Sequence, residues 1–588
     1  MSIIKGGSFI IETIAPEAIF TPEDFSEEHK MIAKTASDFA AKEVEPQLAD
    51  LEAQKEGLMP SLLKQAGELG LLSIDIPEEY GGTGMDKATS MLVCESLARG
   101  GSFVVGHGAH TGIGSLPIVF FGNKEQKQRY LPGLASGELL AAYALTEAGS
   151  GSDALAAKSR AVLSEDGKYY IINGTKQFIT NAAFADVFVT YAKVDGDKFT
   201  AFIIDKDSPG VSTGPEEHKM GIKGSSTRTL ILEDAKVPVE NVLGEIGRGH
   251  VVAFNILNIG RFKLAAGALG NCKLAVEFAV KYAKERKQFG VPIASFGMIR
   301  EKLAEMAVRT YVVESLNYRS AGLIDTILAG IDKEAPDAGI KTAQGIEEYA
   351  IECSINKVAG SEALDFTTDE ALQIFGGYGY ISEYPVERMY RDSRINRIFE
   401  GTNEINRLLI PGTLMRRAMK NEIPLLAAAQ KLKGELMSAV KPVVGEGLAA
   451  EMGLLEQAKK LFLMVAGTAA QKLAAKLVNE QELLANLADM IIDIFSMESA
   501  LLRANKLIDK VGLEKAQAQI DMARVFTHDA FDRIELNGRE SLAAIEEGDV
   551  LRTQLSILKK LGRHDPINII AVRRRIADRI IEAEKYVV

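Results

Sequence analysis

One segment with the pattern of β-strands interrupts a chain of 588 residues that otherwise has helical character. Between residues 156 and 242, short apolar runs alternate with turn signals; residues 169–172, for example, precede Asn173-Gly174. Short runs separated by such signals predict a small, mainly antiparallel β domain. The strand pattern therefore divides the chain into a helical part before it and a helical part after it.

Helical spacing of apolar residues is present on both sides of this segment. Phe25, Ile32, Phe39 and Val44 show it near the beginning of the chain, and it returns at Val251. The predicted fold class is mainly α with a small β domain, and we divide the chain into four parts. These are an N-terminal helical domain (1–140), a middle β domain (141–245), a helical bundle (246–417) and a C-terminal helical extension (418–588).

The composition excludes several classes of function. A net charge of −12 argues against sequence-independent nucleic-acid binding, which needs a basic face. Cys94, Cys272 and Cys353 lie far apart and form no metal-binding spacing with histidine, so no metal site is predicted. No apolar run is expected to reach the length of a membrane span, and the first thirty residues contain two lysines and no arginine. A cytoplasmic protein is the expectation.

Glu400 is the strongest candidate for a catalytic group. It stands between the apolar Phe399 and the flexible Gly401. A carboxylate that is partly desolvated has a raised pKa, which suits a general base. The alternative is a helix end capped by Thr402, with ordinary surface glutamates around it.

Three further segments combine small, aromatic and polar residues. Residues 141–153 could present backbone amides to a polar ligand, or could be a flexible linker. Residues 176–181 place Phe178 beside hydroxyl and amide groups, or could be a strand end with Phe178 in the core. Residues 285–290 place cations where the dipole of a preceding helix favours positive charge. This effect alone could explain the presence of these cations.

Taken in order, these motifs resemble the acyl-CoA dehydrogenase family. The motifs are Leu-Thr-Glu-x-Gly-x-Gly-Ser-Asp (145–153), Gly-x-Lys-x-Phe-Ile-Thr-Asn (174–181), Glu-Arg-Lys-Gln-Phe-Gly (285–290), Gln-x-x-Gly-Gly-x-Gly (373–379) and Phe-Glu-Gly-Thr-Asn-Glu (399–404). The resemblance covers residues 25–417. The chain length and the C-terminal extension are most similar to the very-long-chain branch. The family fold is a helical N-terminal domain, a central β-barrel-like domain and a helical bundle.

The resemblance implies FAD as the cofactor and assigns residues to it. Contacts implied within one subunit are Tyr143, Leu145, Thr146, Gly151, Ser152, Phe178, Ile179 and Thr180. Contacts implied across a dimer interface are Arg286, Gln288, Gln373, Gly376 and Gly377. The last implied contacts are Thr402, Asn403 and Glu404. Many members of the family have tryptophan where this chain has Phe178.

The implied reaction is α,β-dehydrogenation of a fatty acyl-CoA in β-oxidation, with an electron-transfer flavoprotein as electron acceptor. The implied substrate contacts are Ser152, Asn258, Arg261 and Gly401, and Glu400 would remove the α-proton. Some relatives place the base on the helix that contains Asn258, but residues 257–261 offer no carboxylate here. The alternatives are an acyl-CoA oxidase that uses oxygen and a non-catalytic assembly or scaffold protein.

The C-terminal extension has apolar residues at helical spacing and must bury at least one face. These residues include Leu454, Leu455, Ala458, Leu461, Phe462 and Val465. The extension could pack on the catalytic core and replace a second pair of subunits, or lie on the inner face of a membrane beside Lys459 and Lys460. Nearby glutamates weaken any basic face, so we expect a homodimer, with peripheral membrane contact as the secondary alternative.

Overall fold

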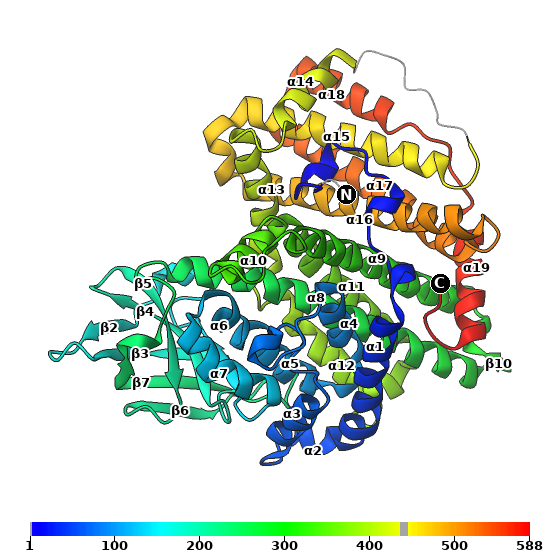
Figure 1. Cartoon of the computed structure of the whole chain (residues 1–588). Helices are drawn as coiled ribbons and strands as arrows, with labels where there is room; N and C mark the ends of the chain where they lie inside the picture. Colours follow the sequence, from blue (N-terminus) through cyan, green and yellow to red (C-terminus); the bar gives the residue numbers. More distant parts are fainter. Residues whose placement is uncertain (1–2, 436–444) are drawn as a thin grey trace.

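The computed structural model describes residues 3–435 and 445–588. The chain opens with an N-terminal segment of short turns and then forms a helical domain (Figure 1). Its helices are α1 (Glu27–Phe39), α2 (Leu48–Glu52), α3 (Leu58–Glu68), α4 (Lys87–Ser96), α5 (Ser102–Gly108), α6 (Leu116–Phe121) and α7 (Lys124–Ser136). Ser26 caps α1 by accepting a hydrogen bond from the His29 N–H. The helical turn Ala109–Gly114 continues α5.

One mixed sheet forms the middle domain, on the left of Figure 1. Its strands are β1 (Ala141–Ala144), β2 (Arg160–Leu163), β3 (Tyr169–Thr180), β4 (Val187–Val194), β5 (Lys198–Asp205), β6 (Val211–Glu216), β7 (Thr227–Pro238) and β8 (Val242–Leu243). The order is β6-β7-β3-β2-β4-β5-β8, with β1 beside β4. The β1–β4 and β2–β4 pairs are parallel and the other pairs are antiparallel.

The turn expected at Asn173-Gly174 does not exist, because β3 continues through both residues. The register between β3 and β7 shifts between Ile172 and Gly174, and the Asn173 amide exchanges hydrogen bonds with Asp234. A Cβ atom on Gly174 would lie 2.1 Å from the Ser159 Oγ atom. The glycine therefore allows close approach of a neighbouring segment at a β-bulge, rather than a turn.

A second helical domain follows the sheet. Its helices are α8 (Gly249–Glu285), α9 (Gly297–Leu328), α10 (Ala338–Glu347), α11 (Ala350–Phe375), α12 (Pro385–Ser393) and α13 (Asn403–Met419). A short hairpin, β9 (Lys287–Gln288) and β10 (Val291–Pro292), joins α8 to α9. Helices α8, α9 and α11 pack against one another and carry many fully buried residues, so they form the buried centre of this domain.

The C-terminal extension is a further helical domain that lies across α9 (Figure 1). Its helices are α14 (Leu425–Glu435), α15 (Ala449–Leu473), α16 (Gln481–Val511), α17 (Gln517–Ile545), α18 (Gly548–Leu561) and α19 (Ile569–Ala583). The six apolar residues named above on α15 are buried, and one apolar core includes residues of α8, α9, α15, α16 and α17. The expected fold class is therefore confirmed, and the extension packs on the helical bundle.

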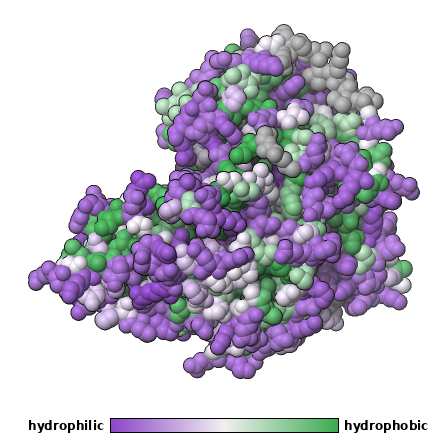
Figure 2. Space-filling view, in the orientation of Figure 1, coloured by the Kyte–Doolittle hydropathy of each residue, from purple (hydrophilic) through white to green (hydrophobic). Residues whose placement is uncertain are grey.

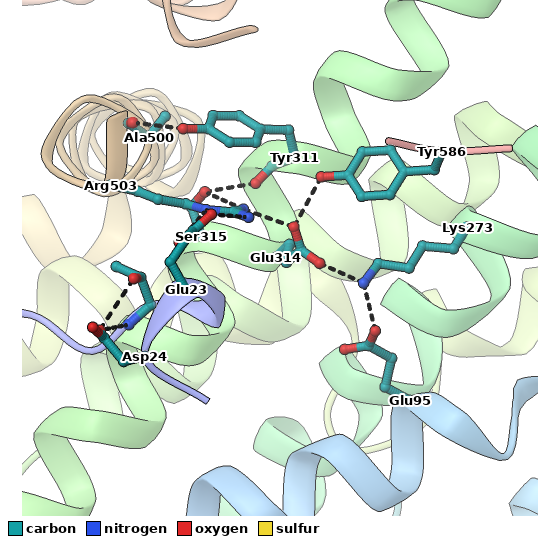
Figure 3. A network of polar contacts seen from close by, with 11 residues as sticks. Glu23, Asp24, Glu95, Lys273, Tyr311, Glu314, Ser315, Ala500, Arg503 and Tyr586 are labelled. Atoms are coloured by element: carbon teal, nitrogen blue, oxygen red, sulfur yellow. Dashed lines mark hydrogen bonds and ion pairs between the residues drawn. The ribbon is translucent and has the colours of Figure 1, made fainter. Parts of the chain in front are cut away.

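A buried polar network reinforces this contact (Figure 3). The Glu314 carboxylate on α9 accepts hydrogen bonds from Arg503 of α16 at 2.7 Å and from the Tyr586 hydroxyl at 2.9 Å. Lys273 of α8 also donates to Glu314, and it donates to Glu95 of α4 at 2.5 Å. Glu314 and Lys273 together thus connect the N-terminal domain, the helical bundle and the C-terminal domain.

The N-terminal segment lies between the helical bundle and the C-terminal domain (Figure 1). The Gly7 N–H donates to the Glu352 carboxylate of α11 at 2.7 Å. The Phe9 ring packs on Phe495 of α16, with ring centroids 4.7 Å apart. Both domains therefore hold this segment in place.

Three helical segments of the described chain are long and apolar enough to cross a membrane: Ser102–Phe121, Gly249–Glu285 and Ala449–Asn479. The expectation that no apolar stretch has this length is wrong, because occasional polar residues do not cancel the apolar average of a helix. In the first two segments, 78% and 72% of the most apolar window is buried, against 39% in the third. Figure 2 shows hydrophilic residues over most of the visible face, with scattered hydrophobic groups.

Candidate active site

Glu400 occupies an unusual backbone conformation just before α13. Its φ is +59° and that of Gly401 is +80°, so two successive residues are left-handed. Such a conformation is costly for a glutamate and persists only where neighbouring groups hold it. The Arg261 Nε atom donates to the Glu400 carbonyl at 3.2 Å, and the Asn406 amide donates to the Gly401 carbonyl at 2.9 Å. Thr402 caps α13, as the helix-end interpretation expected, but Glu400 is not an ordinary surface residue.

Glu400 is half-buried, and one of its two carboxylate oxygens, Oε2, is buried and has no hydrogen-bond partner among the described residues. A Cβ atom on Gly260 of α8 would lie 2.2 Å from this oxygen, so the carboxylate rests directly on the glycine. Burial raises the pKa of Glu400 to about 7, while the nearby charges of Arg261 and Lys357 act to lower it. A carboxylate with this pKa can take up a proton near neutral pH.

A mainly apolar cavity of about 170 Å³ lies beside Glu400. It runs between α8 and the segment formed by α5 and the turn after it. Glycines line both sides, with Gly260 and Gly267 on α8 and Gly108 and Gly112 opposite. The lining continues along α8 to Asn271, which is about 16 Å from Gly260 at the rise of an α-helix. Because glycine has no side chain, these positions leave room for a long, narrow apolar group.

Two of the segments chosen from the sequence meet at this cavity. Thr180, at the end of β3, lines the cavity together with Glu400. Phe178 has a φ of +59° and is 61% exposed, so it is not a core residue. Between Lys176 and Ile179 the register of β3 against β7 shifts, which turns Phe178 outward while Ile179 remains buried. An exposed aromatic beside a hydroxyl is suited to stack on a planar ligand.

The segment after β1 is tied to β3 by a buried ion pair. The Lys176 ammonium donates to Glu147 at 2.7 Å, and the same carboxylate accepts from the Ser159 hydroxyl at 2.6 Å. The Gln177 N–H also donates to the Thr146 carbonyl at 2.8 Å. This pair fixes the two segments relative to each other, and the sequence analysis did not find it.

The remaining residues assigned to the segment after β1 differ in exposure. Tyr143 and Leu145 are buried, and the Tyr143 ring meets Tyr191 edge to face. Gly151 and Ser152 are exposed, and a Cβ atom on Gly151 would meet no atom within 4 Å. The backbone near Gly151 is therefore open to a ligand.

The residues assigned to a dimer contact lie apart from this cavity. Arg286, Gln288, Gln373, Gly376 and Gly377 are exposed, and none of them lines the cavity. The structure brings part of this group together, because the Arg286 guanidinium lies 5.6 Å from the centre of the Tyr378 ring. Within one chain, the assigned FAD residues thus form two separate groups.

The last assigned residues support the loop that carries Glu400. Asn403 is buried, and its Oδ1 atom accepts from the Lys357 ammonium at 2.5 Å. Arg261 donates to the Asn258 Oδ1 atom at 3.0 Å, and both side chains are buried. Glu404 is exposed. Neither Lys357 nor the role of Gly260 was predicted from the sequence. The position of Lys357 among the apolar and small residues of α11 could have indicated a buried functional lysine.

A carboxylate with one buried oxygen lies beside an apolar cavity, where two helical domains meet a β domain; this arrangement suits an enzyme that removes a proton from an apolar substrate. The chain belongs to the acyl-CoA dehydrogenase family. Family models for the acyl-CoA dehydrogenase N-terminal, middle and C-terminal domains match residues 26–138, 142–235 and 247–415. A further model, also described as an acyl-CoA dehydrogenase C-terminal domain, matches residues 457–560.

Similar proteins cover most or all of the chain. A probable acyl-CoA dehydrogenase from Bacillus subtilis (strain 168) is 56% identical over 585 residues, which cover 99% of this chain and 98% of that protein. The mitochondrial very long-chain specific acyl-CoA dehydrogenase of Bos taurus is 38% identical over 84% of this chain and 77% of its own. The crystal structure of an acyl-CoA dehydrogenase complexed with FAD from Bacillus anthracis is 58% identical, with a TM-score of 0.99 and full coverage of both chains.

These comparisons confirm the expected family, the flavin-dependent activity class and the cofactor. The protein is an acyl-CoA dehydrogenase, and its cofactor is FAD.

Proposed function

We propose that the protein dehydrogenates long-chain fatty acyl-CoA thioesters to trans-2-enoyl-CoA in β-oxidation, with Glu400 as the base. The observation that carries this proposal is the half-buried Glu400 carboxylate on the wall of the apolar cavity, with one oxygen buried and unpaired within the described chain. With a pKa near 7, this group can accept the weakly acidic α-proton of a thioester. The positive φ at Glu400 is the type of strain that functional sites retain.

The residues around the cavity fit FAD. The exposed Phe178, the Thr180 hydroxyl on the cavity wall and the open backbone at Gly151 form a surface for a flat ring and its polar edge. When bound, FAD supplies the acceptor for the β-hydride. The protein binds the acyl chain in the cavity, excludes water from it and holds Glu400 at the α-carbon. The Glu400 backbone N–H is the proposed donor to the thioester carbonyl, where negative charge develops.

The preference for long chains is supported by the shape of the cavity. Glycines at Gly108, Gly112 and Gly267 keep it open along about 16 Å of α8. Its lining is mainly apolar over this length. A long acyl chain would replace water along the whole cavity and gain hydrophobic free energy with each methylene, about 0.8 kcal/mol when fully buried.

We further propose a homodimer that uses an electron-transfer flavoprotein as electron acceptor. The exposed group around Arg286 and Gln373 supports the dimer, because these residues resemble FAD contacts of the family yet lie outside the cavity of their own chain. A cytoplasmic location, with peripheral contact to the inner face of a membrane as the secondary possibility, remains part of the proposal. The buried apolar face of α15 favours packing on the protein over insertion into lipid.

The test is anaerobic reduction of the FAD-loaded protein by butyryl-CoA, octanoyl-CoA and palmitoyl-CoA. The rate of reduction is measured from the loss of flavin absorbance. We expect the fastest reduction with palmitoyl-CoA. Glu400→Gln should retain FAD and acyl-CoA but reduce the flavin roughly a thousandfold more slowly, because the amide cannot accept the proton. Near-normal reduction by this variant would remove Glu400 from the reaction. Rapid oxygen consumption by the reduced protein would favour the oxidase.

A further inference from the structure

Lys357 differs from the other buried lysines of the described chain. Each of the others forms an ion pair with a buried or partly buried carboxylate: Lys87 and Lys263 with Asp75, Lys176 with Glu147, and Lys459 with Glu498. Lys357 is fully buried on α11, and its hydrogen-bond partner is the neutral Asn403 side chain at 2.5 Å. A buried ammonium that has no carboxylate partner is costly unless another negative group compensates for it.

Glu400 is the complementary unpaired group. Its Oε2 atom is buried without a hydrogen-bond partner in the described chain, and Lys357 is one of two cations that lower the pKa of this carboxyl. The same interaction opposes the effect of burial on Lys357, whose pKa is nevertheless lowered to about 8. An uncompensated cation and an uncompensated carboxylate therefore lie within electrostatic reach of each other, without direct contact.

Lys357 is also connected to Glu400 through the polypeptide chain. Asn403, which accepts from Lys357, is the first residue of α13 and follows Glu400 by three positions. The Asn403 amide donates to the Ser361 hydroxyl and to the Glu362 carboxylate, both at 3.1 Å. These bonds attach the start of α13 to α11, so the left-handed turn at Glu400 is held from the α11 side as well as by Arg261.

We infer that Lys357 is a positioning residue for Glu400, which fixes the start of α13 through Asn403 and stabilises the ionised carboxylate with its positive charge. This inference rests on the proposed role of Glu400 as the base. The other charged and titratable groups that face the pair are Arg261 of α8, Glu362 of α11, Glu404 of α13 and Tyr143 of β1. Of these, only Arg261 shares the sign of Lys357, so removal of Lys357 leaves one cation near Glu400.

The test compares Lys357→Met with wild type and with Lys357→Arg. The rate of flavin reduction by palmitoyl-CoA is measured from pH 5.5 to 9, and the ionisation of Glu400 is followed by difference infrared spectroscopy against Glu400→Gln. Without the cation, we expect the acid limb of the rate profile and the infrared titration to move up by about one pH unit. In Lys357→Arg, which retains the charge, both should remain near their wild-type positions.

Two further variants make the test decisive. Asn403→Asp gives Lys357 a carboxylate partner and should also raise the pH at which Glu400 titrates. This variant tests the role of Lys357 if Lys357→Met does not fold. Lys459→Met removes another buried lysine, from a pair with Glu498 in the C-terminal domain, and should lower stability without moving the titration.

An unchanged titration in both Lys357→Met and Asn403→Asp would overturn the inference, as would an equal movement in Lys459→Met. The infrared titration does not depend on turnover. Normal flavin reduction by Glu400→Gln would therefore contradict the proposed function while the titration still tests Lys357.

Discussion

At the scale of single residues, the site depends on a position without a side chain, Gly260, as much as on the Glu400 carboxylate. Glu400 can point inward because Gly260 has no side chain. The sequence identified Glu400 and Gly401 through their neighbours in the chain. It did not indicate that a glycine some 140 positions earlier on α8 makes room for the carboxylate, because this contact exists only once α8 and α13 are packed.

Gly260→Ala is expected to lower activity while the fold is retained. The new Cβ atom would lie 2.2 Å from the Glu400 Oε2 atom, so the carboxylate must move. A displacement of about 1 Å at a reacting group can cost about a hundredfold in rate, whereas alanine in place of glycine stabilises a helix by about 0.5–1 kcal/mol. Flavin reduction and the melting temperature are measured together.

Gly412→Ala is the matched control for this prediction. Gly412 lies in α13, and a Cβ atom there would meet no atom within 4 Å. It should gain the helix stabilisation and leave flavin reduction at the wild-type rate. Equal rates in Gly260→Ala and Gly412→Ala would contradict the steric argument.

At the scale of elements, the sequence predicted the helices better than the strands. Helices α8 and α9 lie within the helical bundle predicted for residues 246–417, and both are long and rich in buried apolar residues. The turn expected at Asn173-Gly174 was wrong, because the same two residues serve a bulge within β3. Likewise, the exposure of Phe178 follows from a second register shift of β3, which depends on its partner β7 and not on local sequence.

The ion pair between Lys176 and Glu147 should be essential for the geometry of the flavin segments. Lys176→Met leaves the Glu147 carboxylate without its cation in a buried position, and breaking a buried pair typically costs about 3–5 kcal/mol. We expect a lower melting temperature and reduced FAD content after purification. Lys198→Met breaks an exposed pair with Asp195 beside the same sheet and should leave the melting temperature almost unchanged.

The anchor of the N-terminal segment on α11 should respond to pH. Burial raises the pKa of Glu352 to about 7, above its usual value of 4.5. The Glu352 carboxyl therefore binds a proton more tightly in the folded protein than in the unfolded chain. This difference stabilises the folded protein fully below about pH 4.5, and the stabilisation is lost as the pH rises through 7. Glu352→Gln imitates the protonated form and retains an acceptor for the Gly7 N–H.

At pH 8, Glu352→Gln should be more stable than wild type by about 2 kcal/mol, and at pH 5 the difference should be much smaller. Melting temperatures at the two pH values provide the measurement. A variant that is less stable than wild type at pH 8 would show that the ionised carboxylate strengthens the anchor instead.

At the scale of the whole molecule, the C-terminal domain is part of the catalytic core rather than an appendage. Arg319 of α9 is buried and pairs with Glu498 of α16 at 2.6 Å, and Glu498 also accepts from Lys459 of α15 at 2.6 Å. With the network around Glu314 in Figure 3, charged groups and apolar residues both cross this boundary. The sequence predicted that the extension buries an apolar face, but it could not reveal these pairs between distant residues.

Truncation after Arg417 is therefore expected to yield aggregates. It would expose the apolar side of α9 and leave Arg319 and Glu314 without their C-terminal partners. Light scattering of the full-length and truncated proteins provides the test, with a full-length dimer expected. Glu498→Gln is the control: it should lower the melting temperature but remain a soluble dimer. A truncated protein that stays a soluble dimer would contradict this view.

The position of the N-terminal segment has a consequence for biosynthesis. Gly7 and Phe9 leave the ribosome hundreds of residues before Glu352 and Phe495, the groups that bind them. During translation this segment has no surface to fold on, so its docking must be among the last steps and follows assembly of the two domains around it. Contacts of such large sequence separation form slowly, and a chaperone that recognises exposed apolar segments would find Phe9 accessible until the chain is complete.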